Sequence, residues 1–323
     1  MSVAVVGSGL YTTDNYPRAG TSKFIPEVWS GKMQVKFYKA TCLSEVTNND
    51  WEGEIKDTGD TVIIRSVPDI TIRTYQKGAT LTSEVPNSPN ITLSIDKGKY
   101  FQVVLDDVDK VQADVRLMDL FSDDAGEQMK ISIESDVFAN VGLSADENNV
   151  GLTAGVISDI NMGVTATPCF VASAKVAAGD GALAGSAKSF VDHIIDMGQV
   201  LDEQNVPESG RWLVIPAIGA NRLKKGDIKQ VNVTGDDTSP IRNGKLGMID
   251  RFTLFVSNNL SVTSSKYSLL AGTRDSISFA SQLTKVETIR SSATFGDILR
   301  GLNVFGYAVT APKSLVHSVV QFV

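Results

Sequence analysis

Residues 106–142 read DDVDKVQADVRLMDLFSDDAGEQMKISIESDVFANVG, and this stretch decides the fold. Its apolar residues recur at steps of three and four positions, which is typical of a helix with one buried face. They are Val111, Val115, Met118, Ala125, Met129, Ile133, Val137 and Val141. No proline interrupts the pattern, and Gly142 follows its last member, where a left-handed C-terminal cap is common. We therefore predict one long helix over residues 106–141, which would span roughly 50 Å.

Acidic residues near this helix allow two interpretations. Asp106, Asp107 and Asp109 are either metal ligands or acids that the helix dipole stabilises in a first turn, and we favour the second. Asp236 and Asp237, in a polar segment further on, most simply form a solvated turn. Taken alone, the helix would also suit the core of an α+β enzyme. The rest of the chain is therefore needed to determine the kind of protein to which it belongs.

Length and charge exclude several classes of protein. The chain has 323 residues, 21% of them charged, which allows a substantial core and argues against disorder. No stretch approaches the roughly 20 apolar residues of a membrane span, and the N-terminus lacks the basic segment of a secretion signal. A formal net charge of −7 disfavours sequence-specific nucleic-acid binding, although an acidic protein can still enclose nucleic acid.

Cysteine and histidine are too sparse to indicate a catalytic or metal site. Cys42 and Cys169 lie far apart, so we expect neither a disulfide framework nor a zinc site, and folding in a reducing cytoplasm is the simplest inference. His193 falls between Asp192 and Asp196 on a predicted helix, with no nucleophile apparent nearby. We expect it to be an exposed or half-buried structural histidine.

The first part of the chain is predicted to be an arm. Residues 1–23 are rich in Gly, Ser, Thr and Asn and show no period, which predicts a flexible segment. The run VAVVGSGL resembles a dinucleotide-binding turn, but Thr12 occupies the third glycine position and no helical pattern follows. Residues 24–46 then show a rough apolar stripe with Pro26 in the first turn, which predicts a helical piece.

Alternating residues further on predict a long β-hairpin. Residues 62–67 form a short apolar strand, and residues 70–75 and 91–96 alternate as strands with one covered face do. The connection over residues 76–90 contains a glycine and two prolines and is unusually long for a compact domain. Because a bare two-stranded ribbon is marginal in water, we expect the tip to leave the body and lie on another surface.

The remaining segments predict a mixed α+β protein. Residues 99–105 form a strand that leads into the long helix, and residues 187–205 form a second helix with Ser186 as its N-cap. RWLVIPA, residues 211–217, predicts a buried strand, whereas the polar residues 221–241 predict a surface loop. The chain closes with an Asn-Gly turn and further strands.

Taken in order, several short motifs resemble the major capsid (coat) proteins of tailed bacteriophages. They are FIPEVWS (residues 24–30), WEGEI (51–55), TGDTV (58–62), SIDKGKYFQVVLDDVDKVQAD (94–114), RWLVIPA (211–217), RNGKLGMIDRFTLFVSNNL (242–260) and FGDILRGLNVFGYAVTAPKSL (295–315). Each motif alone is weak, but the ordered set is specific and extends over nearly the whole chain.

The resemblance implies the Hong-Kong-97-type capsid fold, which is an α+β fold with an N-terminal arm, an extended loop, a peripheral domain and an axial domain. The long helix would be the spine of the peripheral domain. The four parts are expected at residues 1–50 (N-terminal arm), 51–100 (extended β-hairpin loop), 101–150 and 281–311 (peripheral domain), and 151–280 and 312–323 (axial domain).

The resemblance also implies a structural function. The chain would self-assemble into the icosahedral head shell that encloses the genome of a tailed bacteriophage, and we expect no catalytic, cofactor-binding or metal-binding residues, hence no enzyme. A hairpin that needs cover fits this expectation, since head-to-tail contacts between copies close into shells. The alternative is the shell protein of a cellular encapsulating nanocompartment of the same fold, which would enclose cargo peptides and no DNA.

The expected partners also come from the resemblance. They are copies of the chain in hexamers and pentamers, a portal protein, a decoration protein in some relatives, and packaged double-stranded DNA without sequence-specific contacts, but no membrane. Because the motifs begin at Phe24, we expect a separate scaffolding protein instead of a fused segment. The expected location is the virion, after assembly in the host bacterial cytoplasm. Some relatives join subunits through a lysine–asparagine bond, but the residues around Lys77 and Asn243 do not match that pattern.

Overall fold

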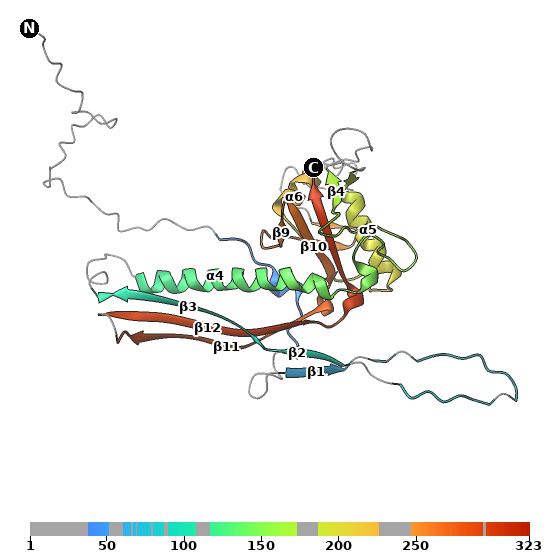
Figure 1. The fold of residues 1–323 in the computed structure, drawn as a ribbon, viewed down its shortest axis with the longest axis horizontal. Helices are drawn as coiled ribbons and strands as arrows, with labels where there is room; N and C mark the ends of the chain where they lie inside the picture. The colour runs from blue at the N-terminus through green and yellow to red at the C-terminus, as the bar shows by residue number, and fades with distance from the viewer. Residues whose placement is uncertain are drawn as a thin grey trace, which may run out of the picture.

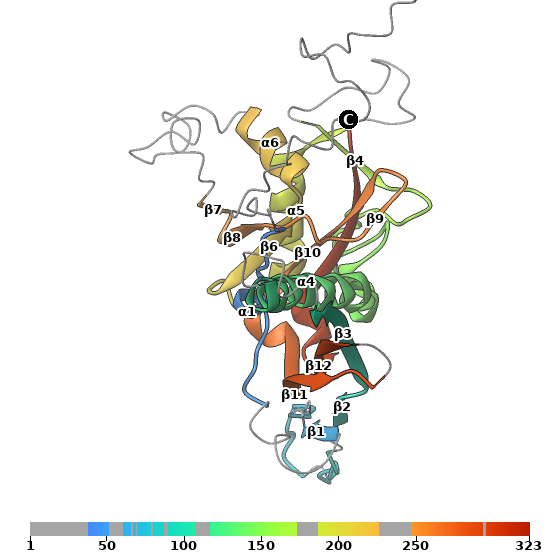
Figure 2. The ribbon, with the colours of Figure 1, turned by 90° about the vertical axis from the view of Figure 1, so that its left-hand side faces the viewer.

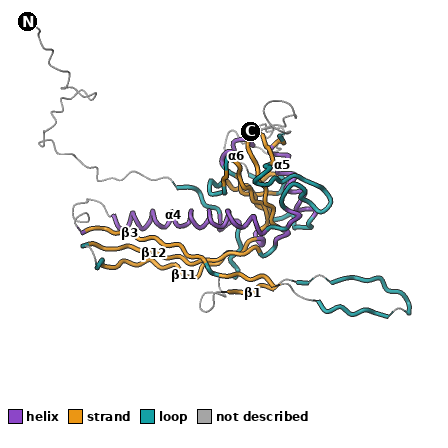
Figure 3. The backbone as a smooth tube through the Cα atoms, in the orientation of Figure 1, coloured by secondary structure: helices purple, strands orange, loops and turns teal. Residues whose placement is uncertain are grey.

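A computed structural model describes residues 38–51, 61–65, 67–68, 70–78, 80–86, 90–107, 117–172, 187–225, 247–292 and 295–323. Its elements form two packed parts (Figure 1). The first is a long helix along a three-stranded sheet, and the second is an eight-stranded sheet with two shorter helices. A two-stranded ribbon lies beside the first part, and a long loop extends from it (Figure 3). The predicted α+β class is confirmed.

The first part is built on an antiparallel sheet in the strand order β11–β12–β3. The strands are Ile277–Arg290 (β11), Gly296–Val309 (β12) and Lys97–Asp106 (β3). Helix α4, Leu117–Asn140, lies along one face of this sheet (Figures 1 and 2). Ile133, Val137 and Phe138 of α4 are buried in one core with Phe305 of β12, as the apolar stripe predicts.

The long helix is confirmed over most of its predicted length, but both ends differ from the prediction. Asp106 ends β3 instead of beginning the helix, and residues 108–116 lie outside the described residues. At the other end the α-helix gives way to a 3₁₀ turn, η1 (Val141–Ser144), which contains Gly142. This glycine has no positive φ, so the predicted left-handed cap is wrong. The position needs glycine because a Cβ there would lie 2.7 Å from the His317 ring.

The second part is a mixed sheet in the order β5–β4–β13–β10–β6–β8–β7, with β9 paired to the start of β10. The strands are Cys169–Ala172 (β4), Lys188–Ser189 (β5), Arg211–Ile215 (β6), Met248–Ile249 (β7), Phe252–Val256 (β8), Val262–Thr263 (β9), Lys266–Thr273 (β10) and Leu315–Phe322 (β13). β10 runs antiparallel to β13 and β6, and β4 and β8 extend the sheet in parallel. Every residue of β6 is buried, which confirms the predicted buried strand.

Two helices pack on this sheet, α5 (Phe190–Glu203) and α6 (Ala217–Lys225). The predicted second helix is confirmed as α5, and its apolar residues enter the core as expected. These residues are Phe190, Ile194, Met197 and Leu201. The N-cap is Ser189, while the predicted Ser186 lies outside the described residues. Short 3₁₀ turns complete the connections at Glu147–Asn149 (η2), Arg274–Ser276 (η4) and Pro312–Ser314 (η5).

Where the structure describes the segment before the first part, from residue 38 to residue 51, it contains one short helix, α1 (Leu43–Val46). Residues 38–42 are not helical, so the helix predicted over residues 24–46 is wrong there. The beginning of this predicted helix and the whole arm that the sequence predicts to be flexible lie outside the described residues. So do Asp236, Asp237 and the predicted Asn-Gly turn at Asn243. α6 occupies the first residues of the segment that the sequence predicted to be a polar loop.

The predicted hairpin exists, but its pairing differs from the prediction. β1 (Thr61–Arg65) pairs antiparallel with β2 (Asn90–Ser94), from Thr61 opposite Ser94 to Arg65 opposite Asn90. Residues 70–75 form no strand, although their side chains alternate. Pro68 precedes them and has no N–H to continue a ladder. The paired ribbon is therefore short, and the loop beyond it is longer than predicted.

Candidate assembly interface

The base of the ribbon is fixed to the first part by a small apolar core. Ile64 of β1 and Leu93 of β2 are buried together with Ala280 of β11. The backbone of β2 also passes close to Gly306 of β12, where an added Cβ would overlap the Ser94 carbonyl oxygen. This packing sets the direction in which the ribbon leaves the body.

Beyond the ribbon, residues 67–68, 70–78 and 80–86 belong to an extended loop that reaches away from the body (Figures 1 and 3). Its tip turns at Lys77 and Gly78, where Gly78 has a φ of 87°. Across the loop, the Glu84 carboxylate accepts hydrogen bonds from the backbone N–H (3.3 Å) and the hydroxyl (3.4 Å) of Thr71. Its apolar side chains are between 67% and 92% exposed: Val67, Ile70, Ile72, Tyr75, Leu81 and Val85.

One face of the three-stranded sheet is also partly uncovered. Lys97 of β3 contacts Asp136 of α4 at 3.4 Å, so strand alternation places Tyr100 on the face that points away from α4. Tyr100 lies directly opposite Leu302 of β12, and both side chains are exposed. Large apolar side chains that meet on an exposed face favour contact with another molecule.

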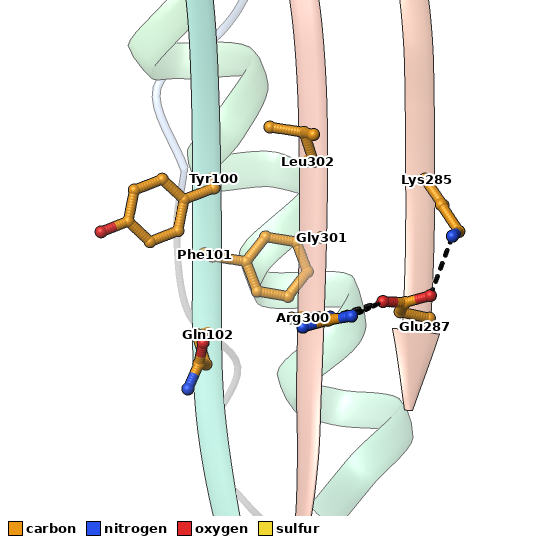
Figure 4. A pocket seen from close by; sticks show the side chains of 8 residues that line it. All are labelled: Tyr100, Phe101, Gln102, Lys285, Glu287, Arg300, Gly301 and Leu302. Carbon is orange, nitrogen blue, oxygen red and sulfur yellow. Dashed lines mark hydrogen bonds and ion pairs between the residues drawn. The ribbon is translucent and has the colours of Figure 1, made fainter. Parts of the chain in front are cut away.

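Beside this pair the sheet has a hollow of 440 Å³, shown in Figure 4. Glu287 of β11 forms ion pairs there with Lys285 (3.0 Å) and with Arg300 of β12. Hydrogen bonds from these two cations hold the pKa of the Glu287 carboxyl below its usual range. The uncovered face is therefore an apolar area with charged groups at its border.

A buried carboxylate attaches the segment before α1 to the rest of the molecule. Glu134 of α4 is fully buried, and its Oε2 accepts hydrogen bonds from the backbone N–H groups of Cys42 (2.6 Å) and Leu43 (2.9 Å). Its Oε1 accepts from the Ser257 hydroxyl and the Asn259 side-chain amide, both at 2.8 Å. One side chain of the long helix thus joins the segment before α1 to the residues after β8.

Comparison with known proteins now identifies the family. A sequence profile described as phage capsid protein matches residues 90–318, which is more than half of the chain. The chain belongs to this family. This match confirms the prediction that the chain is the major capsid protein of a tailed bacteriophage, which forms the head shell. No curated protein sequence matches the chain.

Solved structures agree with the family assignment. A chain from Mycobacterium phage Che8 is 23% identical, with a TM-score of 0.70, over 93% of this capsid protein and 97% of that chain. The capsid of the cyanophage P-SCSP1u is 16% identical, with a TM-score of 0.66 over 99% of both chains. The mature capsid of bacteriophage PhiM1 is 12% identical, with a TM-score of 0.63 over 98% of this chain and 96% of that chain. The capsid protein therefore has the expected Hong-Kong-97-type fold.

The structure describes two of the three acids that the sequence places at the start of the long helix. Asp106 ends β3, and Asp107 forms an ion pair with Arg290 of β11, which also binds Asp297 at 3.2 Å. Asp109 lies outside the described residues. Within the described ranges, no group of three or more His, Cys, Asp or Glu side chains is placed to hold a metal ion. Among the helices that the structure describes, none has the length and apolar character needed to cross a membrane.

The capsid protein buries His193 completely, which corrects the expectation of an exposed or half-buried side chain. The Ser318 hydroxyl donates to the Met162 carbonyl (2.7 Å), so its oxygen accepts from Nε2–H of His193 (2.8 Å). Nδ1 then faces the Cys169 thiol at 3.8 Å. Burial raises the pKa of this thiol, so it is a poor nucleophile. This cluster could not be predicted from local sequence patterns because Ser318 lies 125 positions from His193.

Acid should destabilise the capsid protein through this histidine. Burial lowers the pKa of His193 to about 4, and the cation of Lys188 adds to the effect. As the pH falls, His193 therefore binds a proton in the unfolded chain before it does so in the folded protein. The neutral ring's contribution to the free energy of unfolding is fully present above the unfolded pKa of about 6.5. It is lost as the pH falls toward 4, with a maximum loss of roughly 3 kcal/mol.

Urea unfolding of the unassembled subunit at a series of pH values checks this expectation. The free energy of unfolding should fall between about pH 6.5 and pH 4. His193→Asn, which removes the titrating group, should be less stable near neutral pH but should show a shallower pH dependence in that window. The same slope in both proteins would mean that other groups cause the acid sensitivity.

Proposed function

We propose that this capsid protein joins copies of itself, as hexamers and pentamers, into the icosahedral head shell of a tailed bacteriophage. The extended loop carries the proposal. Its six exposed apolar side chains belong to neither apolar core of the described chain. Covering such area removes apolar surface from water and is favourable by roughly 25 cal/mol per Å². In a capsid protein, the molecule that can cover it is another copy of the chain.

We expect the loop of one subunit to lie on the uncovered sheet face of its neighbour. Val304 of β12 packs against the small core under the subunit's own ribbon. Leu302, two residues away on the same face, and Tyr100 opposite it are exposed. A neighbour's loop would therefore continue the cover at the point where the subunit's own ribbon stops.

The proposal keeps the four parts that the resemblance implies. The three-stranded sheet with α4 supports a peripheral domain at residues 101–150 and 281–311. The eight-stranded sheet supports an axial domain at residues 151–280 and 312–323. Residues 1–50 would be the arm and residues 51–100 the extended hairpin loop. In this proposal the chain acts through its surfaces and is not an enzyme.

The remaining partners in the proposal come from the family resemblance. They are a separate scaffolding protein during assembly in the host bacterial cytoplasm, a portal protein, and double-stranded DNA enclosed without sequence-specific contacts. A net charge of −7 supports the last point, since an acidic chain repels phosphate. A decoration protein on the finished shell is a further option.

Replacing residues 77–89 with a short Gly-Ser turn is expected to leave the subunit folded and to prevent shell formation. The exposed apolar residues of the loop lie outside both described cores, so its loss should change the circular dichroism and the melting temperature only slightly. Electron microscopy and light scattering, with scaffolding protein present, then measure assembly. Outright unfolding would place the segment in the subunit core, and robust shells would show that the loop is no inter-subunit contact.

A second variant separates the length of the loop from its apolar character. Ile72→Ser combined with Val85→Ser keeps the length and removes two side chains that are at least 90% exposed. If covered apolar area drives the contact, this variant should also assemble poorly. Normal assembly would mean that the backbone of the loop, and not these side chains, makes the contact.

A further inference from the structure

A second exposed loop, residues 151–163 between α4 and β4, is held far more firmly than the first. Ala154 and Ile160 exchange backbone hydrogen bonds, both of 2.8 Å, across the loop. The Met162 N–H donates to the Gly151 carbonyl at 2.8 Å, and Val319 of β13 donates to the Met162 carbonyl at 2.9 Å. The loop is therefore a small closed hairpin attached to β13 of the eight-stranded sheet.

A carboxylate from α5 fixes the tip of the 151–163 loop. Glu203 accepts hydrogen bonds from three successive backbone N–H groups, those of Val156 (2.8 Å), Ile157 (2.9 Å) and Ser158 (3.2 Å), and from the Ser158 hydroxyl. These donors, the Ser158 hydroxyl first, lower the pKa of Glu203 to about 2. Gly155, with a φ of 104°, allows the sharp bend before them. The carboxylate is charged at every pH near neutrality, so the tip keeps one conformation.

This fixed tip directs apolar side chains into solvent. Ile157 is 89% exposed, and Val156 and Leu152 beside it are also exposed. A mobile loop could turn such side chains inward, but the hydrogen bonds to Glu203 and between Ala154 and Ile160 prevent that here. We refer to Leu152, Val156 and Ile157 together as the apolar knob. Because the knob is rigid, it has little conformational entropy left to lose on binding, which is the property of an anchor residue in an interface.

We propose that the 151–163 loop is a second contact surface for a neighbouring copy of the chain, with Ile157 as its anchor. The inference rests on the proposed shell function. The extended loop and α5, which carries Glu203, lie toward the same end of the molecule (Figure 1). A neighbour that receives the extended loop is therefore next to this knob as well. Asp159 and Glu203 place negative charge beside the knob, which disfavours the phosphate backbone of the packaged DNA as its partner.

Ile157→Asp tests this proposal, with Met248→Asp as the matched control. Met248 is another exposed apolar residue, but it lies on β7, an end strand of the sheet that is four strands away from β13, to which the loop is attached. Neither change should alter the melting temperature of the unassembled subunit appreciably. In assembly with scaffolding protein, Ile157→Asp should lower the yield of shells about tenfold or more, since it buries an unpaired carboxylate. Met248→Asp should assemble like the parent.

Two further variants keep the test decisive. Ile157→Ser removes the anchor without adding charge and should weaken assembly less than Ile157→Asp. Glu203→Ala keeps the apolar side chains but frees the tip, so hydrogen exchange at residues 156–158 should become faster and shells fewer. If Ile157→Asp and Met248→Asp assemble equally well, the proposal is overturned. If shells of Ile157→Asp form normally and lose only the binding of another virion protein, a neighbouring copy is not the partner. Failure of the parent to form shells would instead refute the proposed function.

Discussion

Replacing Glu134 with alanine is expected to lower the free energy of unfolding of the unassembled subunit by roughly 3–5 kcal/mol. The carboxylate is fully buried and is the acceptor for four donors. Alanine would leave the N–H groups of Cys42 and Leu43 without this acceptor. The Ser257 hydroxyl and the Asn259 amide would keep their longer hydrogen bonds to the Ala40 carbonyl, at 3.4 Å and 3.3 Å. Each unmade bond of a buried polar group costs about 1–3 kcal/mol, and water entering the new space would recover part of this.

The matched control for Glu134→Ala is Glu127→Ala, two turns earlier on the same helix. The Glu127 side chain is 41% exposed and forms an ion pair with Lys130 at 2.6 Å, so its loss should change stability by less than about 1 kcal/mol. Glu134→Gln keeps the shape and one acceptor oxygen, and it should fall between the two alanine variants. Urea denaturation of the three proteins measures these differences. Equal stability of Glu134→Ala and Glu127→Ala would show that the buried hydrogen bonds contribute little.

Cys42 gives a local readout for the same change. Its thiol is buried, and burial together with the charge of Glu134 raises its pKa to about 12, so it should react slowly with thiol reagents. In a Cys169→Ala background, where Cys42 is the single cysteine, Glu134→Ala should speed this reaction strongly. A faster reaction without global unfolding would locate the damage at the attachment of the segment before α1.

The spacing of apolar residues in the sequence correctly predicted the elements that have a buried face. Apolar residues that recur at three- and four-residue steps in α4 and α5, and those of the apolar strand β6, are buried in a core within the subunit itself. The strand predicted over residues 99–105 is β3 for the same reason, since its alternate residues face α4. Residues 70–75 show the same alternation and yet form no strand. Alternation predicts a face that will be covered, and we infer that the cover for this segment belongs to a neighbouring subunit.

Long-range partners could not be predicted from local patterns. The donors to Glu134 are between 91 and 125 positions away, so the sequence shows only a glutamate on a helix stripe. The burial of His193 and the need for glycine at Gly142 depend in the same way on β13, which contributes Ser318 and His317. These features come from topology, which a single sequence does not reveal.

The turn between β7 and β8 could not be predicted from the sequence, for a chemical reason. Asp250 and Arg251 both have positive φ, at 46° and 68°, as a two-residue type I′ hairpin turn requires, but they lack the Asn-Gly signature of such turns. Arg251 forms ion pairs with Asp202 (2.8 Å) and Glu208 (3.0 Å) instead. Tertiary contacts thus hold a conformation that local sequence preference would not select.

Gly306→Ala is expected to damage both the subunit and its assembly, because it changes the point at which the ribbon rests on the sheet. An added Cβ at Gly306 would overlap the Ser94 carbonyl oxygen and lie 2.9 Å from the Cα of Ile95. Both are backbone atoms of the ribbon and the residues that follow it, so no side-chain rotation can relieve the overlap. The ribbon has to move away from β12, and the buried contacts of Leu93 and Ala280 have to open with it.

We expect Gly306→Ala to cost about 2 kcal/mol of stability, which is typical of an overpacked core, and to abolish shells even where the subunit stays folded. The reason is geometric, since a tilt at the base of the ribbon displaces the distant tip of the extended loop by a larger amount. Gly98→Ala is the matched control, because it lies in β3 of the same sheet with its nearest neighbour 4.0 Å from the new Cβ. Differential scanning calorimetry measures the first effect and electron microscopy the second. Shells from Gly306→Ala as numerous as those from Gly98→Ala would mean that the direction of the ribbon does not control assembly.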